Sequence, residues 1–183
     1  MGEVEFYIFD GELWCKSEDG KNQVVNESNT ELIGSVLGQI MECYPAAYKA
    51  LSKEYSRSSA NVPYYQYLIV RRFCKCNFGK LDSTSSDIDT SGRYHFEKVD
   101  CPLRGECKHE GVICSPKFNS KLSEQELRVM KLVYKGVSKE EIAEQLYISP
   151  YTVKNHIKSV YLKLGIHEKS EFIQYANNHN LFN

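Results

Sequence analysis

The chain has 183 residues, of which 42% are hydrophobic and 26% are charged. This length and composition suit a soluble globular chain with one good core or two small ones, and they exclude a large multidomain enzyme. The 23 basic and 24 acidic side chains give a formal net charge of −1, so overall basicity does not indicate a nucleic-acid partner. Because no apolar run approaches about 18 residues and the start lacks a secretory signal, we expect a cytoplasmic protein.

Charge and cysteine content divide the chain into two parts. Residues 1–119 hold 14 basic and 17 acidic side chains, whereas the remainder holds 9 and 7 and contains no cysteine. A short Pro-containing stretch at residues 116–119 joins the two parts. We therefore predict an α+β protein with a mixed α/β module over residues 1–117, a cysteine cluster within it at 74–114, and an all-α domain over residues 118–183.

The first third of the chain predicts a small antiparallel sheet followed by two helices. Alternating apolar residues flank the Asp-Gly pair at residues 10–11, which is a strong hairpin signal, and a third short strand is expected near Val24. Ser28 and Glu31 have the spacing of a capping box, which predicts the start of an amphipathic helix. Pro45 suits the first turn of the next helix.

A run of aromatic and β-branched residues follows Pro63. Since such residues are typical of strands, we predict a strand that continues through about Cys76 and pairs with a second strand at residues 94–100. On a strand, Cys74 and Cys76 project from the same face, and the paired strand brings Cys101 close to them.

Five of the seven cysteines lie in the cluster at residues 74–114, and in a reducing compartment this indicates a role other than disulfides. Zinc takes four ligands in a tetrahedron, and thiolates from a hairpin and the following loop can converge on one ion. We predict a structural Zn²⁺, because metal binding would hold residues 101–117, which have few apolar side chains. An iron–sulfur cluster or a thiol redox switch would use the same residues. The predicted ligands are Cys76, Cys101, Cys107 and Cys114, with Cys74 as the main substitute and His109 as a weaker candidate.

Four helices are predicted in the cysteine-free part of the chain. Two capping boxes, Ser123 with Glu126 and Ser138 with Glu141, predict the start of the first two. A third helix spans residues 149–164, with a proline in its first turn, and a fourth follows it. A short helix, a tight turn and a longer basic helix form the arrangement that places a helix in the major groove of DNA.

The predicted helix at residues 149–164 has two different faces. Apolar residues recur every three or four positions and form an inward stripe, and no acidic side chain occurs in this range. Outward lysines can donate to guanine edges or phosphates, asparagine can pair with adenine, and hydroxyls at the helix start favour a phosphate oxygen. Lysines on one helix are also common on a merely solvated face. The predicted DNA contacts are Ser149, Tyr151, Thr152, Lys154, Asn155 and Lys158.

Four runs of residues form a specific pattern: LSEQE at 122–126, GVSKEEIAEQL at 136–146, ISPYTVKNHI at 148–157 and KLGI at 163–166. The pattern closely resembles the LuxR-type (GerE-type) DNA-binding domain of bacterial transcription regulators. The resemblance implies a four-helix domain that binds double-stranded DNA as a homodimer. It also implies base contacts from Lys154, Asn155 and Lys158, and a dimer contact from the fourth helix around Phe172 to Ala176.

We predict a bacterial, non-enzymatic, sequence-specific transcriptional regulator whose helix at residues 149–164 lies in the major groove, while the N-terminal module senses a signal or governs assembly. One alternative is an interaction protein that docks on RNA polymerase, because the same helical pattern resembles the promoter-reading part of sigma factors. A second alternative is a thiol or metal enzyme with a DNA anchor, suggested by Cys74 and Cys76. The expected partners are double-stranded DNA and a second copy of the chain, and no membrane.

Overall fold

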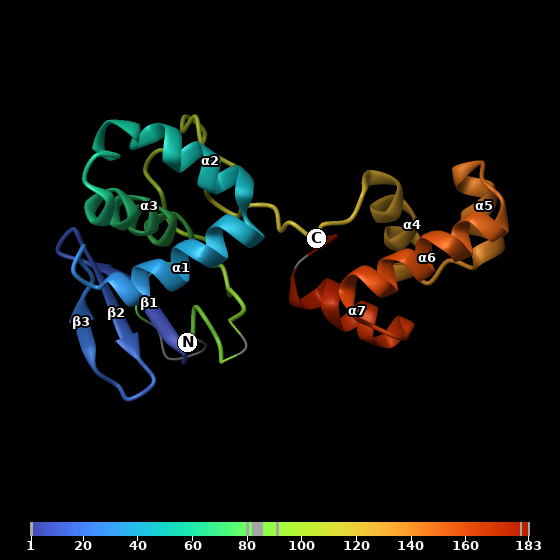
Figure 1. Cartoon of the computed structure of the whole chain (residues 1–183), viewed down its shortest axis with the longest axis horizontal. Helices are drawn as coiled ribbons and strands as arrows, with labels where there is room; N and C mark the ends of the chain where they lie inside the picture. The colour runs from blue at the N-terminus through green and yellow to red at the C-terminus, as the bar shows by residue number, and fades with distance from the viewer. Residues whose placement is uncertain (1, 80, 82–85, 91, 180, 183) are drawn as a thin grey trace. The chain divides into compact units, whose positions relative to one another are not determined.

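In a computed structural model, the chain is described except for residues 1, 80, 82–85, 91, 180 and 183 (Figure 1). It divides into an N-terminal unit, residues 1–117, and a C-terminal unit, residues 118–183. None of the helices in the described part is long and apolar enough to cross a membrane.

A three-stranded antiparallel sheet opens the N-terminal unit, with β1 (Val4–Phe9), β2 (Glu12–Ser17) and β3 (Asn22–Val24) in that order. β1 and β2 pair over their full length. Asp10 and Gly11 turn between them with positive φ angles of 50° and 79°. Positive φ at both central residues is the geometry of a two-residue hairpin, and an Asp-Gly pair tolerates it. The predicted hairpin and third strand are confirmed.

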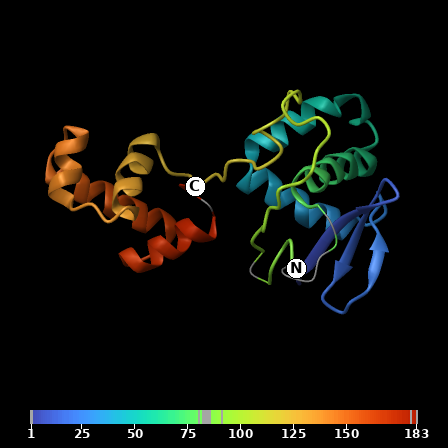
Figure 2. The same ribbon diagram turned by 180° about the vertical axis from the view of Figure 1, so that it is seen from behind.

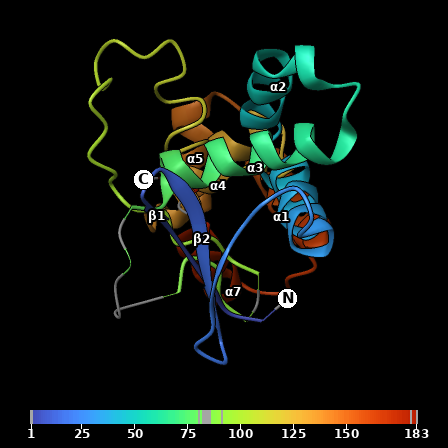
Figure 3. The same cartoon turned by 90° about the vertical axis from the view of Figure 1, so that its left-hand side faces the viewer.

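Three helices follow the sheet: α1 (Thr30–Cys43), α2 (Pro45–Glu54) and α3 (Val62–Asn77), with a short 3-10 helix, η1 (Ser56–Ser58), between the last two. Helix α3 contacts β1 and β2, and it also contacts α1 and α2 (Figure 1, Figure 3). The unit's core therefore lies between the sheet and the helices. The two helices predicted in the first third of the chain, α1 and α2, are confirmed.

The capping box predicted at the start of α1 does not form. The helix begins at Thr30, after Asn29, and no side-chain hydrogen bond caps it. Instead, Asn29 Oδ1 accepts a hydrogen bond from the backbone N–H of Asn26 at 2.8 Å, and Asn26 Oδ1 accepts one from Ser28 at 2.9 Å. The two asparagine side chains close a turn before the helix, and Asn29 occupies the N-cap position. Ser28 therefore lies one residue before the N-cap and does not form a capping box with Glu31.

The strand predicted after Pro63 is wrong, because this segment forms helix α3. The side chain of Asn61 accepts a hydrogen bond from the Tyr64 N–H, and Pro63 lies in the first turn, so the segment has two helix-start features. Its buried residues include Val70, Phe73 and Asn77, which recur at helical spacing. Burial against neighbouring elements outweighs the strand preference of its aromatic and β-branched residues.

The partner strand predicted at residues 94–100 is also wrong. Tyr94 forms only an isolated bridge with Ile88, and the residues after it have no regular structure. The segment contributes two rings to an aromatic cluster whose contacting ring centroids lie between 5.2 and 6.0 Å apart. The cluster consists of Tyr44, Phe73, Phe78, Tyr94 and Phe96.

Helices α4 (Glu124–Tyr134), α5 (Lys139–Leu146), α6 (Pro150–Leu164) and α7 (Lys169–Asn178) form the C-terminal unit, as predicted. Helix α6 contacts α4 and α5, and α4 also contacts α7 (Figure 1). Both predicted capping boxes are present, and α6 ends at Gly165 with a φ of 65°. The buried core consists of Val129, Met130, Val133, Ile142, Ala143, Val153, Val160, Phe172 and Ala176.

Candidate nucleic-acid interface and cysteine pocket

The turn between α5 and α6 fixes where α6 starts. Helix α5 ends at Tyr147 in the left-handed conformation, with a φ of 54°. Ser149 then caps α6, since its Oγ accepts a hydrogen bond from the Thr152 N–H at 3.0 Å and lies 2.9 Å from Thr152 Oγ1. Both hydroxyls thus gather at the N-terminal end of α6, where the helix dipole is positive. Capping accounts for their positions without a ligand.

Helix α6 presents one apolar face and one exposed face, as its periodicity predicts. Val153 and Val160 are fully buried in the core of the unit. The six residues predicted to contact DNA lie at the start of the helix and along the opposite face, where all except the half-buried Thr152 are exposed. The side chain of Tyr151 is 73% exposed. The helix therefore holds a continuous surface that is not used for packing inside the unit.

The positive charge on this exposed face is not paired with an acidic side chain in the described part of the chain. Lys154 and Lys158 form no ion pair with any residue that the structure describes, and α6 contains no acidic side chain. Lys163, near the end of the helix, differs because its Nζ lies 2.7 Å from Glu126 Oε2. Two unpaired ammonium groups one turn apart can approach the phosphates of a double helix.

Glu126 connects α4 to α6, a contact that the sequence did not predict. One of its carboxylate oxygens accepts hydrogen bonds from the Ser123 N–H at 2.8 Å and from Lys163 Nζ at 2.7 Å. The other oxygen accepts a hydrogen bond from Ser159 Oγ at 2.8 Å. Ser159 and Lys163 are four residues apart and therefore share one side of α6. This spacing is the only feature of the sequence that could have indicated their common contact with Glu126.

The Glu126 carboxylate is charged at neutral pH although its side chain is almost fully buried. Burial by itself would raise its pKa, but the hydrogen bonds from Lys163, Ser123 and Ser159 lower the pKa to about 2. A charged carboxylate that accepts hydrogen bonds from three donors holds α4 and α6 in a fixed relation. The capping residue of α4 thereby helps to position the helix that faces outward.

The fourth helix of the unit, α7, uses its apolar residues internally. Phe172 and Ala176 are buried in the core of the C-terminal unit, with exposed fractions of 0% and 3%. Neither side chain is therefore exposed for the dimer contact that the family resemblance implied around them. A dimer contact through α7 would have to use other positions, such as the exposed Gln174.

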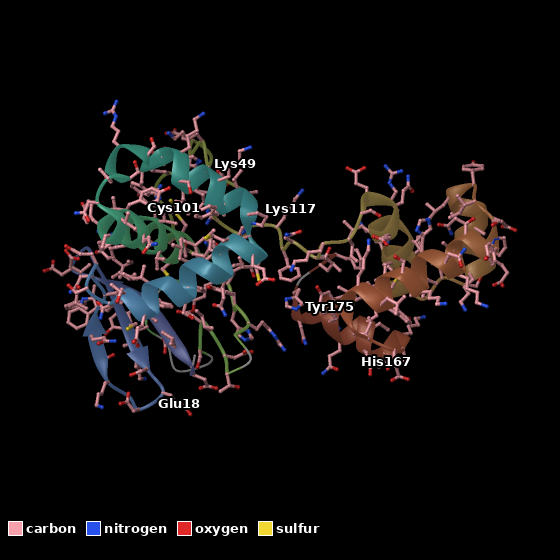
Figure 4. The ribbon with its side chains drawn as sticks, viewed as in Figure 1. Glu18, Lys49, Cys101, Lys117, His167 and Tyr175 are labelled. Atoms are coloured by element: carbon pink, nitrogen blue, oxygen red, sulfur yellow. The ribbon has the colours of Figure 1, made fainter. Side chains whose placement is uncertain are left out.

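In the N-terminal unit, one pocket is lined by all four cysteines that were predicted as metal ligands. Burial raises the pKa of the Cys76 thiol, the Arg72 guanidinium lowers it, and Cys114, Cys101 and Cys107 raise it further. The four thiols thus lie close enough to influence one another, in agreement with their place in one pocket lining. Figure 4 shows Cys101 in this unit, beside α3.

The two substitute ligands differ in their positions. Cys74 does not line the pocket and is only 1% exposed. Burial raises its pKa well above the usual value, and Asp87 and Cys15 raise it further. Cys74 and Cys76 cannot share a face, as they would on a strand, because residues two apart lie on different sides of a helix. His109 does line the pocket, but its Nε2 lies 3.3 Å from Glu54 Oε2.

The pocket is not a ready-made coordination shell for a single ion. Among the residues that the structure describes, no three His, Cys, Asp or Glu side chains are grouped so that they could hold a metal ion. The zinc ion predicted from the sequence therefore stays a prediction, and the four thiols surround a hollow.

Comparison with known proteins concerns only part of the chain. Residues 120–176 match the model of the bacterial regulatory proteins, luxR family. The Fimbriae Z protein of Salmonella typhimurium strain LT2 is 42% identical over 60 residues, which are 33% of this chain and 29% of that protein. The match thus spans less than a third of this relative. Residues 120–176, which include the capped helices α4 to α6 and most of α7, form a LuxR-family helix-turn-helix domain.

Proposed function

We propose that this chain is a sequence-specific transcriptional regulator that binds double-stranded DNA as a homodimer in the bacterial cytoplasm. The observation that supports the proposal is the exposed face of α6, which carries unpaired positive charge within a LuxR-family domain. In this proposal α6 lies in the major groove, and α5 braces it against the backbone. The N-terminal unit senses a signal or governs assembly, and no catalytic group is required.

The exposed residues of α6 suit different parts of the DNA. Lys154 and Lys158 can donate to guanine edges or phosphate oxygens, and Asn155 can form a bidentate pair with adenine. Ser149 and Thr152 lie at the helix start, where backbone N–H groups and the dipole favour a phosphate. In this assignment Asn155 reads sequence, whereas the groups at the helix start fix its register on the duplex.

Replacing Lys154 and Lys158 by alanine should weaken binding to duplex DNA. If each lysine touches a phosphate, the slope of log Kobs against log[salt] should become shallower by about 0.9 for each replacement. Fluorescence anisotropy with a duplex selected from a random pool, recorded across a salt series, measures both quantities. The control is Lys131→Ala, which removes an exposed lysine from α4. Unchanged binding by the double variant would exclude this face, and a selected site without palindromic symmetry would argue against the dimer.

Replacement of two capping serines distinguishes a structural role of Ser149 at the start of α6 from a contact between Ser149 and DNA. Ser149→Ala and Ser138→Ala each remove an oxygen that caps a helix, so both should lower the free energy of unfolding by about 1 kcal/mol. Only Ser149→Ala should also lower DNA affinity, because Ser138 caps α5. Urea unfolding and anisotropy measure the two effects. Equal affinities of the two variants would leave capping as the whole role of Ser149.

A further inference from the structure

Residues 98–117 contain no helix or strand, yet they fold against the ends of α2 and α3 (Figure 2). Hydrogen-bonded turns shape them, such as those from the Cys107 N–H to the Leu103 carbonyl and from the Ile113 N–H to the His109 carbonyl. Ile113 is buried, but Leu103 is 49% exposed. A segment of this length without regular structure and with so little apolar burial needs another source of stability.

The four pocket cysteines differ from the cysteines of the core. Cys76, Cys101, Cys107 and Cys114 are all half-buried and line one pocket, whereas Cys15 and Cys74 are buried and Cys43 is half-buried outside the pocket. A free cysteine that acts as a small hydrophobic residue is usually fully enclosed. Four partly exposed thiols around one hollow are instead the arrangement of a ligand set.

Asn77 holds the cysteine segment against α3 without any metal. Its Nδ2 donates to the Ile113 carbonyl at 2.8 Å, and its Oδ1 accepts a hydrogen bond from the Ser115 N–H at 2.8 Å. Asn77 follows Cys76, and its two partners flank Cys114. The backbone is therefore fixed at the two positions where α3 and the segment each present a thiol.

The charges around the pocket suit an anionic centre. Arg72 and Lys75 of α3 and Arg104 of the segment line it, against the carboxylates of Asp100 and Glu110. The three cations exceed the two carboxylates. Four cysteine thiolates bound to a doubly charged metal centre leave a net charge of −2, which nearby cations stabilise.

The size of the hollow decides between the two kinds of centre that four thiolates can hold. Tetrahedral zinc with Zn–S bonds of about 2.3 Å requires closely grouped sulfur atoms, and no three possible ligands in the described chain are grouped so that they could hold a metal ion. The hollow measures about 160 Å³, whereas one water needs only about 10–15 Å³. A centre with several metal atoms fills such a space better than one ion.

We propose that Cys76, Cys101, Cys107 and Cys114 bind one [4Fe–4S] cluster in the pocket between α3 and residues 98–117. In the transfer of a preassembled [4Fe–4S]²⁺ cluster that carries four thiolate ligands, each cysteine sulfur forms one Fe–S bond as one bond from iron to a donor thiolate breaks. The four cysteine protons pass to the released donor thiolates, and neither the protein nor the cluster is oxidised or reduced. The bound cluster links the irregular segment to α3 and contributes its binding free energy to the folding of the unit.

The test uses the full chain, purified without oxygen and incubated with a preassembled [4Fe–4S]²⁺ cluster that carries small-molecule thiolate ligands. We expect about four iron and four acid-labile sulfide per chain, with a broad visible absorbance that is absent before loading. Cys107→Ser and Cys114→Ser should lose most of this iron, and Cys43→Ser, which lies outside the pocket, should keep it. Fluorescence of the only tryptophan, Trp14, reports whether each variant folds.

A second measurement does not depend on folded variants. In the loaded wild-type protein, the four pocket cysteines should resist alkylation, whereas half-buried Cys43 should react. Zinc alone at one per chain would overturn the cluster in favour of a single ion. A folded wild-type protein that retains neither iron nor zinc after loading, or equal iron in the Cys107→Ser, Cys114→Ser and Cys43→Ser variants, would overturn the site altogether. None of these readouts involves DNA, so their failure is distinguishable from failure of the proposed function.

Discussion

Glu126→Gln should lower the free energy of unfolding of the C-terminal unit by about 2–3 kcal/mol at pH 7. The amide oxygen can still accept the hydrogen bond from the Ser123 N–H, and the amide NH2 would then have to donate to Ser159 Oγ, but the side chain loses the charge that binds Lys163. The folded carboxylate has a pKa of about 2 instead of 4.5. A difference of this size corresponds to about 3 kcal/mol of stability for a buried group. Because the Lys163 side chain is 44% exposed, solvent screening places the expected effect at or below that value.

The same carboxylate predicts how stability depends on pH. Above about pH 4.5 Glu126 is charged in both the folded and the unfolded chain, and its full contribution is present. As the pH falls from about 4.5 to about 2, the unfolded chain binds the proton first, so stability decreases through this window. Below about pH 2 both states are protonated and the contribution is gone. The glutamine variant should lack this component of the pH dependence.

Glu141→Gln is the matched control for this prediction. Glu141 occupies the same position in the capping box of α5, and its Oε2 accepts a hydrogen bond from the Ser138 N–H at 3.1 Å. It is exposed and has no lysine partner in the described chain, so its replacement should have a much smaller effect. Methyl NMR signals of Val153 and Val160 during urea unfolding report on the C-terminal unit alone. Equal stability of the two variants at pH 7 would contradict the proposed role of Glu126.

The C-terminal helices were predictable because their signals are local. Ser123 with Glu126 and Ser138 with Glu141 mark helix starts within four residues of sequence, and the structure contains both capping boxes. The exposed face of α6 follows from the same local periodicity. The contact between Glu126 and Lys163 joins residues 37 positions apart, which no local pattern specifies.

Helix α3 shows why local reasoning failed in the N-terminal unit. Its aromatic and β-branched residues favour a strand, but burial against β1 and β2 and against α1 and α2 favours a helix. Side chains repeat their direction every two residues in a strand but every 3.6 residues in a helix. In the helix that forms, Cys74 is buried in the core and Cys76 lines the pocket. The grouping of Cys76 with Cys101 was thus expected from a strand pair, although in the structure a helix end and an irregular segment produce it.

Asn77→Ala should destabilise the N-terminal unit by about 3 kcal/mol. Asn77 is fully buried and hydrogen-bonds the Phe73 carbonyl at 2.9 Å as well as the Ile113 carbonyl and the Ser115 N–H. Alanine leaves the last two backbone groups without these partners, and an unsatisfied buried polar group costs about 1–3 kcal/mol. The variant also removes the link between α3 and the cysteine segment, so proteolysis within residues 98–117 should become faster.

Asn61→Ala provides the comparison, because it removes an asparagine from the other end of the same helix. Asn61 is exposed and accepts one capping hydrogen bond from the Tyr64 N–H, so its replacement should cost about 1 kcal/mol. Trp14 fluorescence during urea unfolding of the metal-free full chain measures both variants, since the only tryptophan lies in this unit. If the two variants unfold at the same urea concentration, the buried amide of Asn77 does not stabilise the cysteine segment at residues 98–117. Binding of a metal centre must then provide most of the stability of this segment.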